Sequence, residues 1–477
     1  MSSRAAVLEW ALTFVAAALM AVLLAMGSAQ APAQDSVGVG AARELEMPFK
    51  LVDAGAAVPA ELREAVGLGG EPDEERARAL EELERAIEAD PAAPGHLLLG
   101  AAIAVSEGAD DLGLRALDRV ADDAAGLETW KLLVDNLHDL ARDRPARQIE
   151  PTLSELRNAD ASEWLVQRVL ARHAALSGQP SVQVAASAEA QGRASRFAER
   201  AAASIVIVGS LLLLGALLLI VWPLIGRALT GAGRTGLGAL PSPFIVAATR
   251  RVTALWFVGF LAIGLTLELV FNAAGSGLML TSLNLVSQTL LAGGLSLALI
   301  QSLARRPEDP TPLWVPLRLG ALKPAGGVLG LLVWILAGLS IAVVVVAAAS
   351  IIQAAFGVSS EEAQPVLRLF AEGEDPQVRV AIALSAVLMG PIFEEILFRG
   401  FIYRNLRDLM GPPLAMLLSA LLFGLVHLQV PLIIPLGALG VVLAFLFERS
   451  GSLLVPIAVH ALWNLGQLLM AQLLVSG

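Results

Sequence analysis

The chain has 477 residues, of which 56% are hydrophobic and 16% charged, and a mean hydropathy of +0.69. This composition is too apolar for a soluble protein of that length. It contains no cysteine, which excludes disulfides, thiolate metal ligands and a cysteine nucleophile. Residues 31–200 hold 31 acidic and 18 basic side chains, a net charge of −13, so the rest of the chain carries +2 of the total −11. No basic patch with interleaved aromatic residues is present, and a nucleic-acid partner is not expected.

Residues 5–26 form an apolar run preceded by Arg4, long enough to span a membrane as a helix. The Ser-Ala-Gln-Ala stretch at 28–31 is typical of a signal cleavage site. Residues 1–34 therefore fit either a signal anchor or a cleaved signal peptide, and in both cases the following domain is expected to be exported.

Residues 35–200 are predicted to form an acidic α-helical domain. Ala79, Leu83 and Ile87 recur at intervals of four and predict one buried stripe, and Asp90-Pro91 is expected to end that helix. The pattern fits a plain helical bundle with a solvated acidic face, or a tetratricopeptide-like helical hairpin. The histidines of this region show no metal-ligand spacing, so no chemistry is expected there.

From residue 201 onward the chain becomes a series of apolar runs, each about twenty residues long. They lie near 201–222, 252–273, 276–301, 325–356, 377–400, 412–429, 431–447 and 453–475. With the first segment they predict an all-α polytopic membrane protein with about nine transmembrane helices and an exported α-helical domain. Transmembrane helices are expected over 201–324, and an intramembrane core over 325–477.

Clusters of basic residues follow the second, fourth, sixth and eighth spans, whereas the acidic stretch 361–375 lies on the opposite side. The positive-inside rule then places the basic loops in the cytoplasm of a plasma (inner) membrane protein. Residues 35–200 are predicted to lie outside the cytoplasm.

Three short stretches near the C-terminus place ionisable side chains inside apolar sequence, where such groups are costly and mark functional sites. The residues are Glu394, Glu395, Arg399, His427, His460 and Asn464. Residues four apart share a helix face, so Glu395 is predicted to pair with Arg399. That pairing leaves Glu394 free to face a substrate.

The spacing also predicts a common depth in the membrane. Glu394 precedes Gly411 by 17 residues and His427 follows it by 16, so a hairpin turning at Gly411 would bring them level. His460, counted from the next turn, is expected at a similar level.

Peptide hydrolysis needs an activated water, a proton for the leaving amine and stabilisation of the oxyanion. Glu394 is expected to take the proton of the water and His427 to help hold it, while His460 and Asn464 donate to the oxyanion. Glu394, His427 and His460 could instead hold a zinc ion. No cofactor is expected to be required, with zinc as the alternative.

The motifs Glu-Glu-x-x-x-Arg at 394–399, Phe-x-x-x-His at 423–427 and His-x-x-x-Asn at 460–464 resemble the CAAX protease and bacteriocin-processing family. The family comprises type II CAAX prenyl endopeptidases and their bacterial relatives, and the resemblance covers roughly residues 377–470. It implies a membrane core of about eight helices with an active-site cavity open to the cytoplasm. It also implies an intramembrane endopeptidase in which Glu394 activates water, His427 is its partner, and His460 and Asn464 form the oxyanion site.

A membrane transporter and a catalytically silent immunity or scaffold protein are the alternatives. A transporter is expected to show internal repeats and a silent relative to have lost a motif residue, and neither feature is present. The expected partners are a peptide or protein substrate, the lipid bilayer and an additional protein partner for the exported domain.

Overall fold

The computed structural model describes residues 39–54, 72–89, 94–122, 127–158, 161–229, 237, 242–274, 278–319, 327–355, 365–372 and 376–475. The predicted first span and cleavage site lie outside these residues. Within the described ranges every regular element is helical, and the only extended pairing is an isolated bridge between Phe244 and Arg305. The predicted all-α class is confirmed.

The described residues divide into two compact units, up to residue 206 and over 207–472. The first contains α2 (Val39–Ala54), α4 (Pro72–Ala89), α5 (Pro94–Ser106), α6 (Asp110–Asp122), α7 (Leu127–Ala141), α8 (Ile149–Asn158), α9 (Glu163–Leu176) and the start of α10 (Pro180–Leu229). The stripe of Ala79, Leu83 and Ile87 is buried as predicted, and α4 ends directly before Asp90. The buried core of this unit draws only on its own helices, which is the mark of a part that can fold alone.

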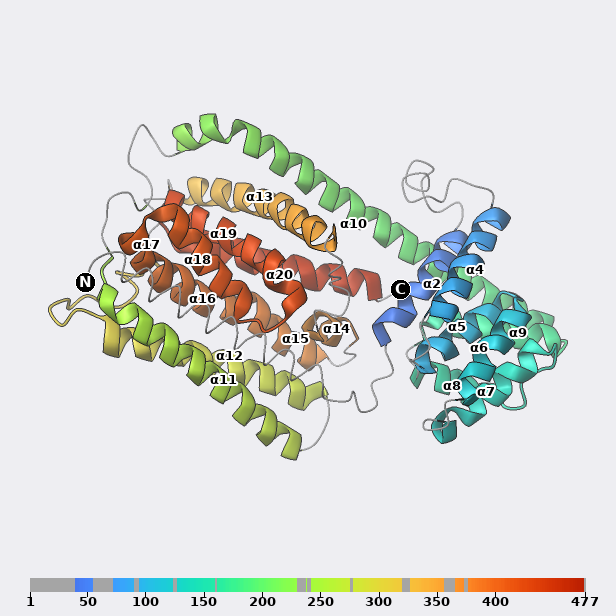
Figure 1. Ribbon diagram of the computed structural model, residues 1–477. Helices are drawn as coiled ribbons and strands as arrows, with labels where there is room; N and C mark the ends of the chain where they lie inside the picture. The colour runs from blue at the N-terminus through green and yellow to red at the C-terminus, as the bar shows by residue number, and fades with distance from the viewer. Residues whose placement is uncertain are drawn as a thin grey trace. The chain divides into compact units, whose positions relative to one another are not determined.

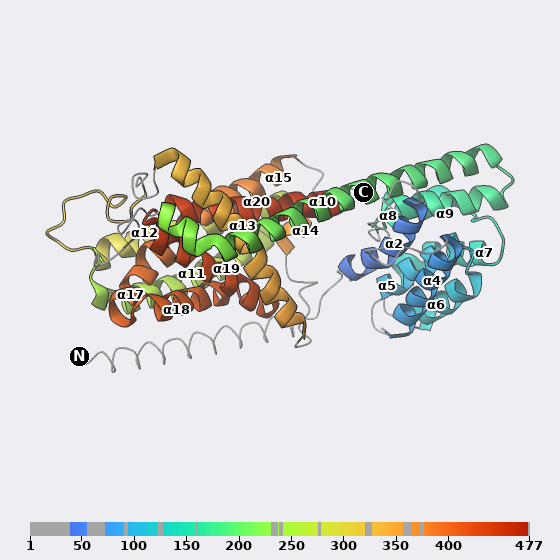
Figure 2. The same ribbon diagram turned by 90° about the horizontal axis from the view of Figure 1, so that it is seen from above.

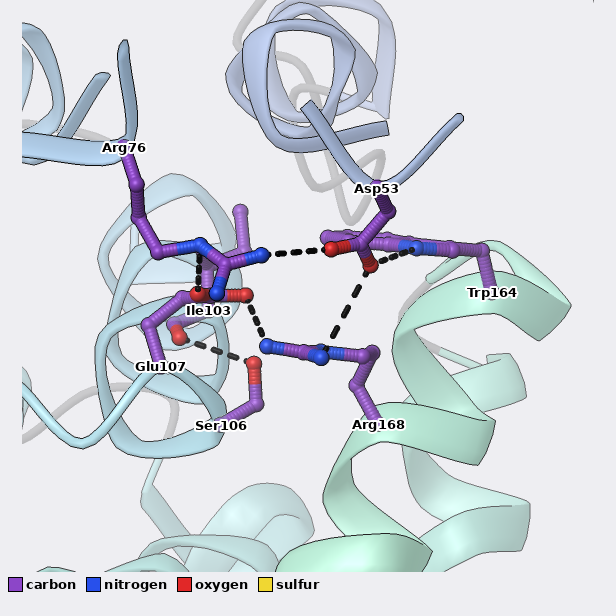
Figure 3. A network of polar contacts seen from close by, with 7 residues as sticks. All are labelled: Asp53, Arg76, Ile103, Ser106, Glu107, Trp164 and Arg168. Carbon is purple, nitrogen blue, oxygen red and sulfur yellow. Dashed lines mark hydrogen bonds and ion pairs between the residues drawn. The ribbon is translucent and has the colours of Figure 1, made fainter. Parts of the chain in front are cut away.

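Four charged side chains join the helices of this unit (Figure 3). Arg76 contacts Asp53 at 2.6 Å and Glu107 at 3.1 Å. Arg168 contacts the same two carboxylates, at 3.7 Å from Asp53 and at hydrogen-bond distance from Glu107. The Trp164 indole also donates to Asp53 at 3.0 Å. We call Asp53, Arg76, Glu107 and Arg168 the ionic clasp, because together they tie α2 and α4 to α9 and to the end of α5.

The second unit is the membrane part. It contains the end of α10, α11 (Thr249–Ala274), α12 (Leu278–Leu299), η3 (Ile300–Ala304), α13 (Gly327–Ala355), α14 (Pro365–Glu372), α15 (Pro376–Ala383), η4 (Leu384–Met389), α16 (Gly390–Glu395), η5 (Ile396–Tyr403), α17 (Arg404–Met410), α18 (Pro412–Leu425), η6 (Val430–Leu432), α19 (Ile433–Ser450) and α20 (Leu454–Val475). A short 3-10 turn, η2 (Val246–Ala248), precedes α11.

Seven helical stretches of the described residues are long and apolar enough to cross a membrane, and α18 is a shorter apolar helix. These eight coincide, within a few residues at most ends, with the eight runs predicted from residue 201 onward. The predicted boundary at 200/201 falls inside α10, which continues unbroken from Pro180 to Leu229 (Figure 2). The change from polar to apolar composition there does not interrupt the backbone hydrogen bonding of the helix.

In the membrane unit, α11 and α12 lie side by side at one edge, and α13 packs on α19 at the other (Figure 1). The segment from α16 to α20, with its connecting turns, lies between them and contains all six predicted site residues. One wall of the site is therefore a helical hairpin that is distant in sequence from the motifs.

Candidate active site

The segment carrying the two glutamates is not a regular α-helix. Between residues 376 and 410 the α-helical pieces α15, α16 and α17 alternate with the π-helical segments η4 and η5. π-Helical turns are rare and concentrate at functional sites, because they widen the helix and re-aim its side chains. Glu394 and Glu395 end the short α16 piece between the two π segments.

Glu395 and Arg399 form a buried ion pair, as their spacing predicts. Arg399 Nη1 donates to Glu395 Oε1 at 2.7 Å, and Nη2 donates to the Gly440 carbonyl at 3.1 Å. Both side chains are at most 1% exposed. The guanidinium also lies 4.5 Å from the centre of the Phe423 ring. Arg399 thus ties Glu395 to α19, through the Gly440 carbonyl, and to α18, through the Phe423 ring.

His460 lies between the two glutamates. Its Nδ1 is 3.0 Å from Glu395 Oε1, and its Nε2 is 3.9 Å from Glu394 Oε2. Because a carboxylate accepts hydrogen bonds, the contact with Glu395 fixes a proton on Nδ1 and turns Nε2 toward Glu394. Glu394 Oε2 has no hydrogen-bond partner, although it is buried.

His427 follows the end of α18. Its Nδ1 donates to the Phe423 carbonyl at 2.8 Å, which leaves Nε2 as a free acceptor. Leu428, the next residue, has a φ of +57°, a left-handed conformation that is strained for a bulky side chain. The Phe423 ring packs edge-on against both His427 and His460, at 5.1 and 5.6 Å between ring centres. The phenylalanine of the motif is therefore a packing residue that spaces the two histidines.

Asn464 takes a position that its motif did not suggest. Its Nδ2 donates to the Ala386 carbonyl at 2.7 Å, within the π-helical segment η4. The side chain does not line the cavity described below. The contact braces a widened turn, and the oxyanion role of Asn464 stays a prediction that requires its amide to turn.

A cavity of about 1020 Å³ lies against this group. Glu394 and His427 form part of one wall, and α11 and α12 form the opposite one. Trp256 and Phe398 close one end and are buried, at 7% and 1% exposure. Glu268 and Asn272, near the C-terminal end of α11, line the other end and are exposed. These two side chains lie at the end of α11 away from Arg250 and Arg251.

The opposite wall carries polar residues that lie outside the three sequence motifs. Glu268 and Asn272 on α11, and Asn284 and Gln288 on α12, all line the cavity. Each pair is four residues apart and interrupts an apolar run. That spacing on one helix face is the signal that could have revealed them.

Among the described residues, no group of three or more histidine, aspartate or glutamate side chains is arranged to bind a metal ion. The zinc set of Glu394, His427 and His460 does not come together as such a group.

Known proteins are similar to the region of the chain that carries the three motifs. The family described as type II CAAX prenyl endopeptidase Rce1-like matches residues 376–466. A protein of Bacillus subtilis (strain 168) named "Putative membrane peptidase YdiL" is 33% identical over 136 residues, which cover 28% of this chain and 53% of that protein. The chain thus spans about half the length of that curated relative. No solved structure matches the chain. Residues 376–466 are therefore similar to type II CAAX prenyl endopeptidases, in agreement with the resemblance carried by the three motifs.

Proposed function

We propose that the membrane unit is an intramembrane endopeptidase in which Glu394 activates a water molecule against a peptide carbonyl. The observation that carries the proposal is the shared cavity wall. Glu394, with an unpartnered carboxylate oxygen, and His427, with a free Nε2, both line a space large enough for a peptide segment.

The first chemical step is the addition of water. A water held between Glu394 and the Nε2 of His427 gives one proton to Glu394 as its oxygen attacks the carbonyl carbon. The electrons of the carbonyl double bond move onto its oxygen, which becomes the oxyanion. Collapse of this intermediate breaks the carbon–nitrogen bond, and the proton held by Glu394 passes to the leaving nitrogen. The products are one carboxylic acid and one amine.

His460 can accept the proton of Glu394, and Glu395 can stabilise the charge that results. His460 Nε2, 3.9 Å from Glu394, can take up that proton and, once it carries the proton, can donate to the oxyanion. The imidazolium so formed would be compensated by the Glu395 carboxylate, which also contacts Arg399. Arg399, Glu395 and His460 thus act as one supporting chain behind the water-activating carboxylate.

The decisive experiment compares wild type with Glu394→Gln on a library of internally quenched peptides. Glutamine keeps the volume of the side chain but cannot accept a proton, so turnover is expected to fall on the order of 10²-fold or more. Glu308→Gln is the matched control, because it removes the same charge from an exposed residue outside the cavity. Near wild-type turnover by a folded Glu394→Gln protein would exclude the glutamate mechanism. A zinc chelator added to wild type tests the metal alternative, and loss of activity restored by zinc would favour it.

We further propose that the basic loops face the cytoplasm and residues 35–200 the other side, with the cavity opening toward that same outer side. The exposed lining residues Glu268 and Asn272 lie at the end of α11 opposite Arg250 and Arg251, which the positive-inside rule places in the cytoplasm. This differs from the cytoplasmic opening expected from the family resemblance.

The absence of cysteine allows a direct test of this orientation. Single cysteines are introduced as Ser181→Cys, Asn272→Cys and Asp309→Cys, and intact cells are treated with a membrane-impermeant maleimide. Positions 181 and 272 are expected to react and position 309 only after permeabilisation. Labelling of 309 in intact cells would reverse the topology, and protection of 272 alone would return the opening to the cytoplasmic side.

A further inference from the structure

The cavity wall opposite Glu394 is more polar than a lipid-embedded hairpin requires. Glu268, Asn272, Asn284 and Gln288 all line the cavity. Polar side chains inside a membrane are costly and are retained where they pair with a partner or a ligand. This wall is the natural place for the residues that bind substrate.

Several atoms of the cavity lack a partner in a way that indicates the ligand's chemistry. Asn284 Oδ1, Gln429 Oε1 and Glu394 Oε2 are buried without a hydrogen-bond partner, and all three residues line the cavity. Each atom is an acceptor and needs a donor. An extended peptide supplies such donors as backbone N–H groups that its own chain leaves unpaired.

The charge of the cavity points to a cationic substrate side chain. Among the described residues lining it, Glu394 and Glu268 are acidic and none is lysine or arginine. Glu268 therefore faces the cavity without a basic side chain on that wall. A carboxylate so placed attracts a positive charge and rejects a negative one.

Contacts between helices give the distance between Glu268 and the reacting carboxylate. A Cβ built on Gly293 would lie 2.3 Å from the Phe393 ring, so Gly293 is level with the residue before Glu394. On α11, Gly264 lies against the Gln288 side chain of α12, and Gly259 lies against Leu295. The two helices are antiparallel, so these pairs place Gly293 of α12 opposite about residue 260 of α11. Glu268 lies about eight residues further along, or roughly 12 Å at the helical rise of 1.5 Å per residue. An extended peptide covers that distance in about three to four residues.

We propose that Glu268 forms a specificity subsite for a lysine or arginine about three to four residues from the cleaved bond of an extended peptide. The proposal rests on the endopeptidase function proposed above. Asn284 and Gln429 accept backbone N–H groups of the same peptide, and the basic side chain lies at the open end of the cavity beside Glu268.

The test uses internally quenched apolar peptides of ten residues, each with a single lysine at a different position. Matched peptides carry glutamine or glutamate at the same position as the lysine. At about three to four residues from the cleaved bond, lysine is expected to raise kcat/KM roughly tenfold over glutamine. Glu268→Gln should bring that ratio close to one, and Glu268→Lys should favour the glutamate peptide. Glu308→Gln should keep the wild-type preference.

Binding to the Glu394→Gln protein separates this subsite from the proposed chemistry. The dissociation constants of the same peptides should favour lysine in Glu394→Gln, and adding Glu268→Gln should remove that preference. Cleavage by wild type without a lysine preference at any position would overturn the subsite and leave the endopeptidase intact. A lysine preference in binding, with no cleavage of any peptide, would keep the subsite and overturn the endopeptidase.

Discussion

The two units each bury a group of charged side chains, and the two groups differ in their balance. In the ionic clasp, two carboxylates meet two guanidinium groups, and each carboxylate contacts both of them. In the membrane site, the carboxylates of Glu394 and Glu395 meet Arg399 and His460, of which Arg399 alone is permanently charged. The degree of burial does not separate the groups, since the side chains of Glu107 and Glu395 are 1% and 0% exposed.

In our proposal, this balance of charge separates the structural group from the reactive one. The clasp is neutral with every member ionised, so it needs no mobile proton and can remain fixed. The membrane site is neutral only if one proton resides on Glu394 or on His460. A proton that can occupy either of two neighbouring groups is available for transfer.

The largest expected effect follows from removing the arginine of each group. Arg399→Met leaves Glu395 buried without its permanent countercharge, which should cost about 3–5 kcal/mol. Arg168→Met should cost less, because Arg76 still contacts both carboxylates of the clasp and the Arg168 side chain is 20% exposed. Tryptophan-fluorescence melting of the two variants measures the difference.

A double variant separates stability from catalysis in the same experiment. Glu395→Gln combined with Arg399→Met removes both charges and should recover much of the lost stability without recovering turnover. Equal destabilisation by Arg399→Met and Arg168→Met would contradict the contrast between the two groups.

A smaller effect is expected from a histidine outside the membrane. His173 Nδ1 accepts the Ala146 N–H at 3.1 Å, and burial lowers its pKa from the usual 6.5. Because the unfolded chain then binds the proton more readily than the folded chain, the stability that depends on neutral His173 is fully present above pH 6.5. It is lost as the pH falls through 6.5 toward the lowered folded value. Each unit of lowering corresponds to about 1.4 kcal/mol.

Urea unfolding of residues 39–200 between pH 5 and 8 measures this effect by comparing wild type with His173→Gln. The variant should lack the loss of stability below pH 6.5, and His138→Gln, the control, should retain it. Burial raises the pKa of the Glu107, Asp110 and Glu155 carboxyls, so their ionisation removes stability as the pH rises above the ordinary values of 4.5 for the glutamates and 3.8 for the aspartate. That background is common to all three proteins, and an unchanged pH profile in His173→Gln would refute the assignment.

The smallest effect is expected from removing the acidic domain. Deleting residues 35–200 should leave kcat/KM for a short model peptide unchanged, because the proposed water-activating and oxyanion groups all lie after residue 390. The acidic surface would then affect the rate of encounter with larger substrates or partners, and this effect should be sensitive to salt.

His427→Ala and His460→Ala should instead lose turnover on every substrate. A truncated protein that folds but cleaves no short peptide would make the domain part of the catalytic unit.

The features that the sequence could predict depend on local spacing. Apolar runs located the eight helical stretches after residue 201, and a four-residue interval was enough to pair Glu395 with Arg399. The contact of Asn464 with Ala386 could not be predicted in this way, because helical-face arguments assume 3.6 residues per turn and η4 does not follow it. The position of Glu268 relative to Glu394 depends on contacts between helices far apart in sequence, such as Gly293 against Phe393, and no local pattern reports these.

The backbone strain at Leu428 lowers the stability of the protein. Its left-handed backbone, at a φ of +57°, is unfavourable for leucine by about 1–2 kcal/mol, whereas glycine would adopt it freely. The strained residue lies directly beside His427 and contributes its own side chain to the cavity wall. Leu428→Gly would relieve this backbone strain and raise thermal stability, but it would remove a rigid support for His427. Attempts to stabilise this protein for structural work should therefore leave position 428 unchanged, because a gain in melting temperature at this residue would come at the expense of the candidate active site.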